Sequence, residues 1–166
     1  NLGAVLGTVD GALKVAPGRL GIWGHSNGGS VALGIMEISG KNYPTVLWAP
    51  VTKAFPESIL HFADEMDDEG AYLRDIVADF VQKYNPRLYS PPQYVRWLMA
   101  PVQLHQGTAD EAVPYVWSDN FAKSLEQLHK QIIYYKYSGE DHNFSKGSWT
   151  TLVTRDLLFY RKNFAL

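Results

Sequence analysis

Short runs of apolar residues alternate along the chain with longer segments in which apolar residues recur every three or four positions. The short runs predict buried β-strands; they cover residues 19–24, 43–50, 100–107 and 131–139. The longer segments predict amphipathic helices; they cover residues 1–14, 27–39, 116–129 and 147–163. Strands without a polar face are typical of a parallel sheet that is covered on both sides. The predicted fold class is α/β, a three-layer α/β/α sandwich around a short, mainly parallel sheet of about four strands.

The spacing within each helical segment predicts the side that packs against the sheet. In residues 27–39 that side carries Val31, Ile35 and Ile38. In the two later segments it carries Phe121, Leu125 and Leu128, and then Trp149, Leu152, Val153, Leu157 and Tyr160. We expect these side chains to be buried.

Residues 52–99 interrupt the alternation and are interpreted as a cap inserted over a site, the alternative being a peripheral helical excursion. The insert begins with an acidic run at 64–70 and a helical pattern through Tyr72 and Ile76. The acidic run lacks the spacing of a calcium-binding loop, which favours a solvated surface. In the aromatic segment that follows, candidate substrate contacts are Tyr89, Tyr94 and Trp97, although such residues also suit the interior of the cap.

Composition narrows the functions that the chain can have. Its 166 residues suffice for one domain with a core, and 46% of them are apolar. The net charge of −2 gives no attraction to nucleic acid or an anionic membrane, and no apolar run approaches a membrane span. The chain has no cysteine, hence no disulfide and no thiolate metal site. It begins at Asn1 with no visible leader, so the localisation stays unknown.

Three side chains with complementary chemistry follow predicted strands. Ser26 follows the first strand, Asp110 the third and His142 the fourth. Because the carboxyl ends of parallel strands meet at one edge of a sheet, we expect the three to lie close together. A serine hydroxyl needs a base to take its proton, imidazole is suited to neutral pH, and a carboxylate fixes the tautomer of the imidazole. The order therefore predicts nucleophilic catalysis.

The segment Gly24-His25-Ser26-Asn27-Gly28 matches the G-x-S-x-G pattern of a nucleophile elbow. Such a sharp strand-to-helix turn requires residues without bulk two positions before and after the serine. Gly28 and Gly29 are expected to let the helix approach its neighbouring strands closely. The backbone N–H of Asn27 stands at a helix N-terminus and is the candidate oxyanion donor. His25 is a candidate substrate contact that also suits packing beside the turn.

Other ionisable residues offer weaker alternatives. Glu111 and Asp141 are rival acids, but Asp141 is adjacent to His142, and neighbouring side chains rarely align on the same ring. His105 lies within a strand and is interpreted as a hydrogen-bonded core histidine. Together with His61 and His129 it shows no metal-ligand spacing, so no metal is expected.

The chain resembles the α/β-hydrolase family, and within it the prolyl-oligopeptidase-like and dienelactone-hydrolase-like esterases and peptidases. The matching words are "GIWGHSNGG", "APVQLHQGTADEAVP" and "YSGEDHNF". The resemblance implies that Ser26 is the nucleophile, His142 the general base and Asp110 its orienting acid, with no cofactor. We expect hydrolysis of a small-molecule carboxylic ester through an acyl-enzyme, and esters are preferred over peptides because the insert shows no paired-glutamate clamp for a free amino terminus. The alternatives are the catalytic part of a peptidase and a non-catalytic binding module.

The resemblance covers residues 1–166 as a single domain but only the second half of the family's fold. A loop carrying the second oxyanion donor does not precede Ser26. The strand at 19–24 would also present a bare edge. Three explanations stay open: a missing N-terminal half, pairing with another copy in a homo-oligomer, or shielding of the edge by the helix at 1–14.

Overall fold

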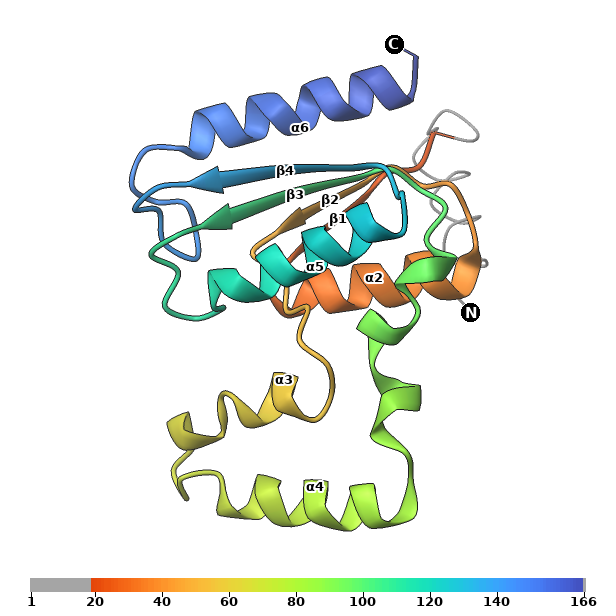
Figure 1. Ribbon diagram of the computed structural model, residues 1–166. Coiled ribbons are helices and arrows are strands. Elements are labelled where there is room, and N and C mark those ends of the chain that lie inside the picture. The colour runs from red at the N-terminus through yellow and green to blue at the C-terminus, as the bar shows by residue number, and fades with distance from the viewer. Residues whose placement is uncertain (1–18, 166) are drawn as a thin grey trace, which may run out of the picture.

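Four parallel strands form one sheet in the computed structural model, which describes residues 19–165 (Figure 1). The strands follow one another across the sheet in chain order: β1 (Ile22–His25), β2 (Thr45–Trp48), β3 (Val102–Gly107) and β4 (Ile132–Tyr137). All three pairings are parallel, as the sequence predicts. The helix expected at residues 1–14 lies outside the described residues.

Helices cover both faces of the sheet. Figure 1 shows α2 (Asn27–Ser39) and α5 (Tyr115–Gln127) on one side and α6 (Trp149–Asn163) on the other. Each of these helices follows a strand, and their bounds agree with the predicted segments to within a few residues. Because side chains alternate along a strand, each strand contributes to both layers. Within residues 19–165, no helix is both long enough and apolar enough to span a membrane.

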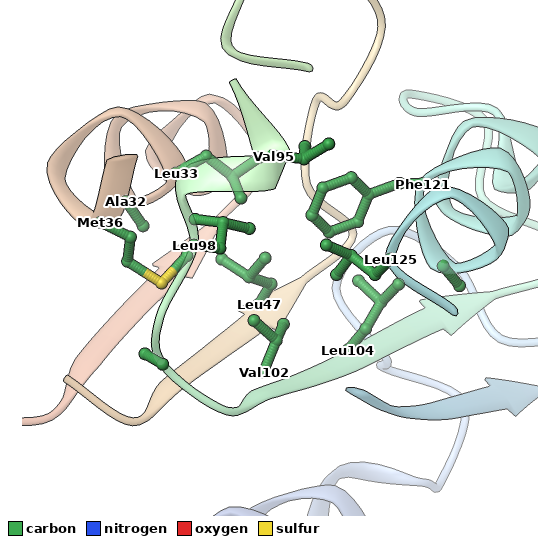
Figure 2. Packing of buried hydrophobic residues seen from close by; sticks show 12 residues of the cluster. Ala32, Leu33, Met36, Leu47, Val95, Leu98, Val102, Leu104, Phe121 and Leu125 are labelled. Carbon is green, nitrogen blue, oxygen red and sulfur yellow. The ribbon is translucent and has the colours of Figure 1, made fainter. Parts of the chain in front are cut away.

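The larger hydrophobic core lies between the sheet and the helices α2 and α5 (Figure 2). Leu47 of β2 and Leu104 of β3 are fully buried at its centre. Helix α2 contributes Leu33 and Met36, and α5 contributes Leu125. Burial of a side chain of this size stabilises the fold by about 1.5–3 kcal/mol. This core fixes the two helices whose ends carry the site described below.

The layer beneath α6 combines aromatic residues with a buried polar network. Asp156 of α6 accepts hydrogen bonds from Trp48 Nε1 and Gln103 Nε2, each at 2.9 Å, and His105 Nε2 lies 2.9 Å from the same carboxylate. The Tyr137 hydroxyl lies 2.8 Å from His105 Nδ1. Burial, partly opposed by Asp156, lowers the pKa of His105 and keeps the ring neutral. His105 is therefore the hydrogen-bonded core histidine that the sequence predicts.

Replacing Asp156 with alanine is expected to destabilise the protein by at least about 3 kcal/mol, since each buried donor left unsatisfied costs about 1–3 kcal/mol. The change leaves buried donors of Trp48, Gln103 and His105 without their acceptor, and an unpaired buried donor carries its full desolvation penalty. Urea unfolding of the two proteins measures the difference. Asp79→Ala is the matched control, because Asp79 forms an exposed ion pair with Lys83 and its loss should change stability by under about 1 kcal/mol. Equal losses in the two variants would contradict the role of the network.

The predicted inner face of α2 is wrong. Val31 and Ile38 are 64% and 87% exposed, whereas Leu33 and Met36 are fully buried. The rotation of α2 is set at its first turn, where Gly29 lies against Pro50 so closely that a β-carbon would overlap the proline. Hydrophobic spacing alone does not contain this constraint.

The other helices depart from the predicted faces in fewer positions. In α6, Leu152 and Phe159 are buried but Trp149 and Leu157 are exposed, because Asp156 takes an inner position. Phe121 and Leu125 of α5 are buried as predicted, whereas Leu128 follows the helix and is exposed.

The chain between β2 and β3 forms an excursion away from the sheet (Figure 1). It contains α3 (Glu57–Leu60), α4 (Ala71–Lys83) and the short 3₁₀ helices η1 (Ala63–Glu65), η2 (Pro86–Tyr89), η3 (Pro91–Gln93) and η4 (Val95–Trp97). The base of the excursion is closed by the buried Ser90, whose hydroxyl bonds Phe55 N at 3.0 Å and Phe55 O at 3.1 Å. In the acidic run, Asp68 accepts from the N–H groups of Gly70 and Tyr72 at the start of α4. Tyr72 and Ile76 are exposed, because α4 buries mainly Val77.

Candidate active site

Ser26 occupies the turn between β1 and α2. Its φ of 56° and ψ of −125° are a sparsely populated conformation for a residue with a side chain. The turn is over-determined by its hydrogen bonds: Ser26 N donates to Trp48 O, and Ser26 O accepts from Gly29 N and Val51 N. A strained backbone held in this way is typical of a serine presented at a functional site.

Close packing explains two of the glycines around Ser26. A β-carbon at Gly24 would lie 2.6 Å from the carbonyl oxygen of Gly28, and one at Gly29 would overlap Pro50. The sequence interpretation is correct for Gly29 but wrong for Gly28, where a β-carbon would meet nothing within 4 Å. The close approach of the two backbones therefore requires a glycine at position 24 and not at position 28.

The N–H of Asn27 stands at the first position of α2, directly after Ser26. The first N–H groups of a helix have no intrahelical acceptor, and the helix dipole places partial positive charge there. An oxyanion that forms on a group attached to Ser26 would meet this N–H first. The structure is therefore consistent with the predicted donor.

Asp110 follows β3 and its side chain is fully buried. Its Oδ1 accepts from Ala112 N at 2.9 Å and Val113 N at 2.8 Å, and its Oδ2 accepts from Gln106 Nε2 at 2.8 Å. Burial pushes the pKa of Asp110 upward, but the hydrogen bonds from His142, Val113 and Gln106 outweigh it and hold the pKa below its ordinary value. The buried group is therefore a carboxylate at neutral pH.

His142 follows β4 and pairs with Asp110. Its Nδ1 lies 2.9 Å from Asp110 Oδ2 and 3.1 Å from Oδ1. A carboxylate can only accept a hydrogen bond, so Nδ1 carries the proton. In the neutral ring, Nε2 then holds the free lone pair that a general base needs.

The loops that carry Asp110 and His142 are tied to each other. Thr108 N donates to Tyr137 O, and Ala109 N donates to Glu140 O. Gly107 permits this approach, because a β-carbon there would overlap the backbone of Glu140. The Asp141 carboxylate accepts from the N–H groups of Asn143 and Ser145, and so caps the turn that carries His142 instead of contacting its ring.

His25 links the serine turn to the histidine loop. Its Nε2 lies 3.0 Å from the carbonyl oxygen of His142, and the two ring centroids are 4.6 Å apart. A carbonyl only accepts, so Nε2 of His25 donates and holds its proton. Burial, the largest influence, lowers the pKa of His25, which keeps this ring neutral. His25 therefore holds the loop that carries His142 against the turn that carries Ser26.

The structure brings Asp110 and His142 into direct contact and places Ser26 on the adjoining turn. Among residues 19–165, no hydrogen bond joins the Ser26 hydroxyl to the His142 ring. Catalytic hydrogen bonds are often long in the absence of substrate and shorten in the reacting complex.

Sequence reasoning missed a second set of residues around Asp110. Gln106 donates to Asp110 and accepts from Ser118 Oγ at 2.7 Å. The Asp110 carboxylate is therefore fixed by a fully buried side chain that is itself hydrogen-bonded. The signal was the glutamine itself, a polar residue in an otherwise buried strand. Beside Ser26, Val51 packs with Val113 and Trp117 in a small apolar cluster.

Tyr89, Tyr94 and Trp97 lie elsewhere. They line a cleft against the C-terminal half of α2, with Gly34, Glu37 and Ile38. The lining contains none of Ser26, Asp110 and His142, because Ser26 stands at the opposite end of α2. Tyr89 also packs edge-on against Phe80 of α4, within the excursion between β2 and β3. Contact with a substrate at Ser26 stays a prediction for these three residues.

Across residues 19–165, no group of three or more histidine, aspartate or glutamate side chains is arranged to hold a metal ion. The His61 ring packs edge-on against Trp117, with the two centroids 4.9 Å apart. The candidate site of this part of the chain is therefore made of Ser26, His142, Asp110 and the Asn27 N–H.

Several solved structures share this arrangement of strands and helices. The chain is similar to a puromycin-hydrolyzing peptidase from Mycobacterium tuberculosis, with 26% identity and a TM-score of 0.72 over 97% of this chain and 24% of that one. It is similar to the acylaminoacyl peptidase of Pyrococcus horikoshii, with 20% identity and a TM-score of 0.71 over 96% of this chain and 26% of that one. It is also similar to a thermophilic esterase from Thermogutta terrifontis, with 20% identity and a TM-score of 0.61 over 85% of this chain and 54% of that one.

The likeness extends to the level of a sequence family. The profile of the prolyl oligopeptidase family matches residues 9–165. No curated protein was found to match the chain. The chain spans about a quarter of the length of the two peptidases above and about half of the length of the esterase.

Proposed function

Because the chain belongs to the prolyl oligopeptidase family, a family of α/β-type serine hydrolases, we propose that it hydrolyses carboxylic esters with Ser26 as the nucleophile. The observation that carries this proposal is the buried Asp110–His142 pair, at 2.9 Å, beside a serine held at a φ of 56°. A carboxylate that fixes the imidazole tautomer, next to a half-buried serine with a strained backbone, is the arrangement that acyl transfer needs.

The proposed reaction has two halves. Ser26 Oγ attacks the ester carbonyl carbon, its proton passes to His142 Nε2, and the oxyanion accepts a hydrogen bond from Asn27 N–H. The C–O bond to the alcohol then breaks, and His142 returns the proton to the departing alkoxide. Water attacks the acyl-enzyme with His142 again as base, which releases the carboxylic acid and restores the serine hydroxyl. Asp110 stabilises the imidazolium in both halves.

The number of assigned oxyanion donors supports esters over peptides. One backbone donor, Asn27 N–H, is assigned to the oxyanion within residues 19–165, and each oxyanion donor contributes about 10²- to 10³-fold in rate. An alkoxide departs more easily than an amine, so an ester needs less of this stabilisation.

The second candidate is that these residues form the catalytic part of a peptidase. The observation that favours it is the nature of the similar structures, since two of the three described above are peptidases. The same triad chemistry cleaves amides. Whether the chain hydrolyses esters or peptides therefore depends on how well the site assists departure of the amine, and not on the nucleophile.

A comparison of matched substrates tests the proposal. We expect a short-chain nitrophenyl ester to be hydrolysed with a kcat/KM at least about 10³-fold above that of the nitroanilide with the same acyl group. We also expect a fluorophosphonate probe to label Ser26, as identified by mass spectrometry of the labelled peptide. Hydrolysis of the anilide within about tenfold of the ester would assign the peptidase function instead. A chain that stays unlabelled would overturn both.

A further inference from the structure

Glu37 is a buried carboxyl group that the proposed reaction does not use. It lies in the C-terminal half of α2 and is only 6% exposed. Among residues 19–165, its Oε1 is buried and has no hydrogen-bond partner. A buried carboxylate without a partner is strongly unfavourable, so its persistence calls for an explanation.

The pKa of the Glu37 carboxyl group reflects its burial without a hydrogen-bond partner. Burial raises the pKa of Glu37 to about 8. Below that pH the group holds a proton, and above it an unpaired negative charge is buried. Either state leaves hydrogen-bonding capacity that a ligand can use.

Glu37 lines a cleft of about 360 Å³ whose opposite wall is aromatic. Tyr89, Tyr94 and Trp97 form this wall, with the Tyr94 and Trp97 ring centroids 4.6 Å apart. The Tyr94 hydroxyl already donates to Leu88 O at 2.9 Å. The aromatic wall is therefore available mainly through its ring surfaces.

We propose that this cleft binds a small organic cation, a primary ammonium group on an apolar body, with Glu37 as its counter-ion. An ammonium supplies both the hydrogen-bond donors and the positive charge that the buried carboxylate lacks. Aromatic faces attract cations, and the Arg96 guanidinium, 5.8 Å from the Trp97 ring centroid, shows this ring already in contact with one. The apolar body fills the remaining space against Tyr94 and Ile38.

The cleft is separate from the candidate active site. Gly34 and Glu37 follow Ser26 by two to three helical turns, which corresponds to more than about 10 Å along α2. Binding in the cleft therefore does not depend on the proposed hydrolysis. Its test can succeed or fail whatever the outcome for Ser26.

The test is a titration of the full chain with 2-phenylethylamine at pH 8.5, followed through the tryptophan indole N–H signals by NMR. We expect saturable shifts of the Trp97 signal. Glu37→Gln keeps the shape of the side chain and removes its charge, and should weaken binding at least about tenfold. Glu126→Gln changes an exposed carboxylate on α5 and is the matched control, with no expected effect. The uncharged 2-phenylethanol should bind both proteins equally weakly.

The pH dependence gives a second readout. Below about pH 8 the ligand must displace the proton of Glu37, so the affinity should fall as the pH falls, by up to about tenfold per pH unit. The ligand stays protonated over pH 6–8.5. The other ionisable groups that face Glu37 across the cleft are the phenols of Tyr89 and Tyr94, and Arg96 lies against Trp97. Glu37→Gln should remove the dependence.

Three outcomes would overturn the proposal: no saturable binding, equal affinity in wild type and Glu37→Gln, or equal affinity for the amine and the alcohol. Urea unfolding of Glu37→Gln establishes that the variant is folded, since removing an unpaired buried charge should leave its stability unchanged or higher. The Trp97→Leu variant provides a second test. This variant retains the Glu37 carboxylate and removes one aromatic ring, so it should also weaken the binding of 2-phenylethylamine.

Discussion

Ser26→Ala is expected to lower kcat for a short-chain nitrophenyl ester by about 10⁴- to 10⁶-fold. The variant removes the atom that attacks the carbonyl and keeps the turn, because Ser26 is fixed by backbone hydrogen bonds that alanine also forms. Its stability should change little. The residual rate of the variant reflects the contributions of the Asn27 N–H and of substrate binding.

Steady-state hydrolysis with active-site titration measures this loss. Ser124→Ala is the matched control, because the Ser124 hydroxyl bonds only the carbonyl of Asn120 within its own helix. Its rate should equal that of the wild type. Retention of activity by Ser26→Ala, with unchanged labelling by fluorophosphonate, would place the nucleophile elsewhere.

Asp110→Asn is expected to lower kcat by about 10⁴-fold. The carboxylate holds the proton on His142 Nδ1, at 2.9 Å, and leaves Nε2 free to act as base. An amide can donate to Nδ1 instead, which stabilises the tautomer with the proton on Nε2. The ring then cannot accept the serine proton, and the imidazolium loses its counter-charge.

Glu111→Gln is the control that separates Asp110 from its rival acid. Glu111 is exposed next to Asp110 in the chain, so its neutralisation should change kcat by less than about twofold. Circular dichroism and urea unfolding establish that Asp110→Asn is folded, because Asn keeps one oxygen for the N–H groups of Ala112 and Val113. A larger loss in Glu111→Gln than in Asp110→Asn would assign the orienting role to Glu111.

The strands were predictable because each is a short apolar run ended by glycine or proline, and parallel topology follows when a helix or excursion separates consecutive strands. The rotation of α2 was not predictable. Its spacing favoured Val31 and Ile38 as the buried face, but the contact of Gly29 with Pro50 turns Leu33 and Met36 inward. A contact between residues distant in sequence overrode a local pattern.

The pairing of Asp110 with His142 was predictable from one rule, that the loops after parallel strands meet at one edge of the sheet. The support from Gln106 was not, because it depends on which face of β3 a side chain occupies. The position of Tyr94 and Trp97 depends on consecutive 3₁₀ turns, η3 and η4, that have no simple periodicity. Sequence could therefore name these aromatic residues but not the carboxylate that they face.

The hydrogen bonds between Ser90 and Phe55 make the excursion a segment whose two ends lie side by side. Residues 56–89 leave and return at one point, where a single hydroxyl bonds both backbone groups of Phe55 at 3.0 and 3.1 Å. A segment with adjacent ends can be shortened, lengthened or exchanged for little entropic cost, since loop closure depends only weakly on loop length. We therefore expect insertions between Phe55 and Ser90 to leave the register of the sheet unchanged, provided that His61 and Phe62 keep their contacts with Trp117.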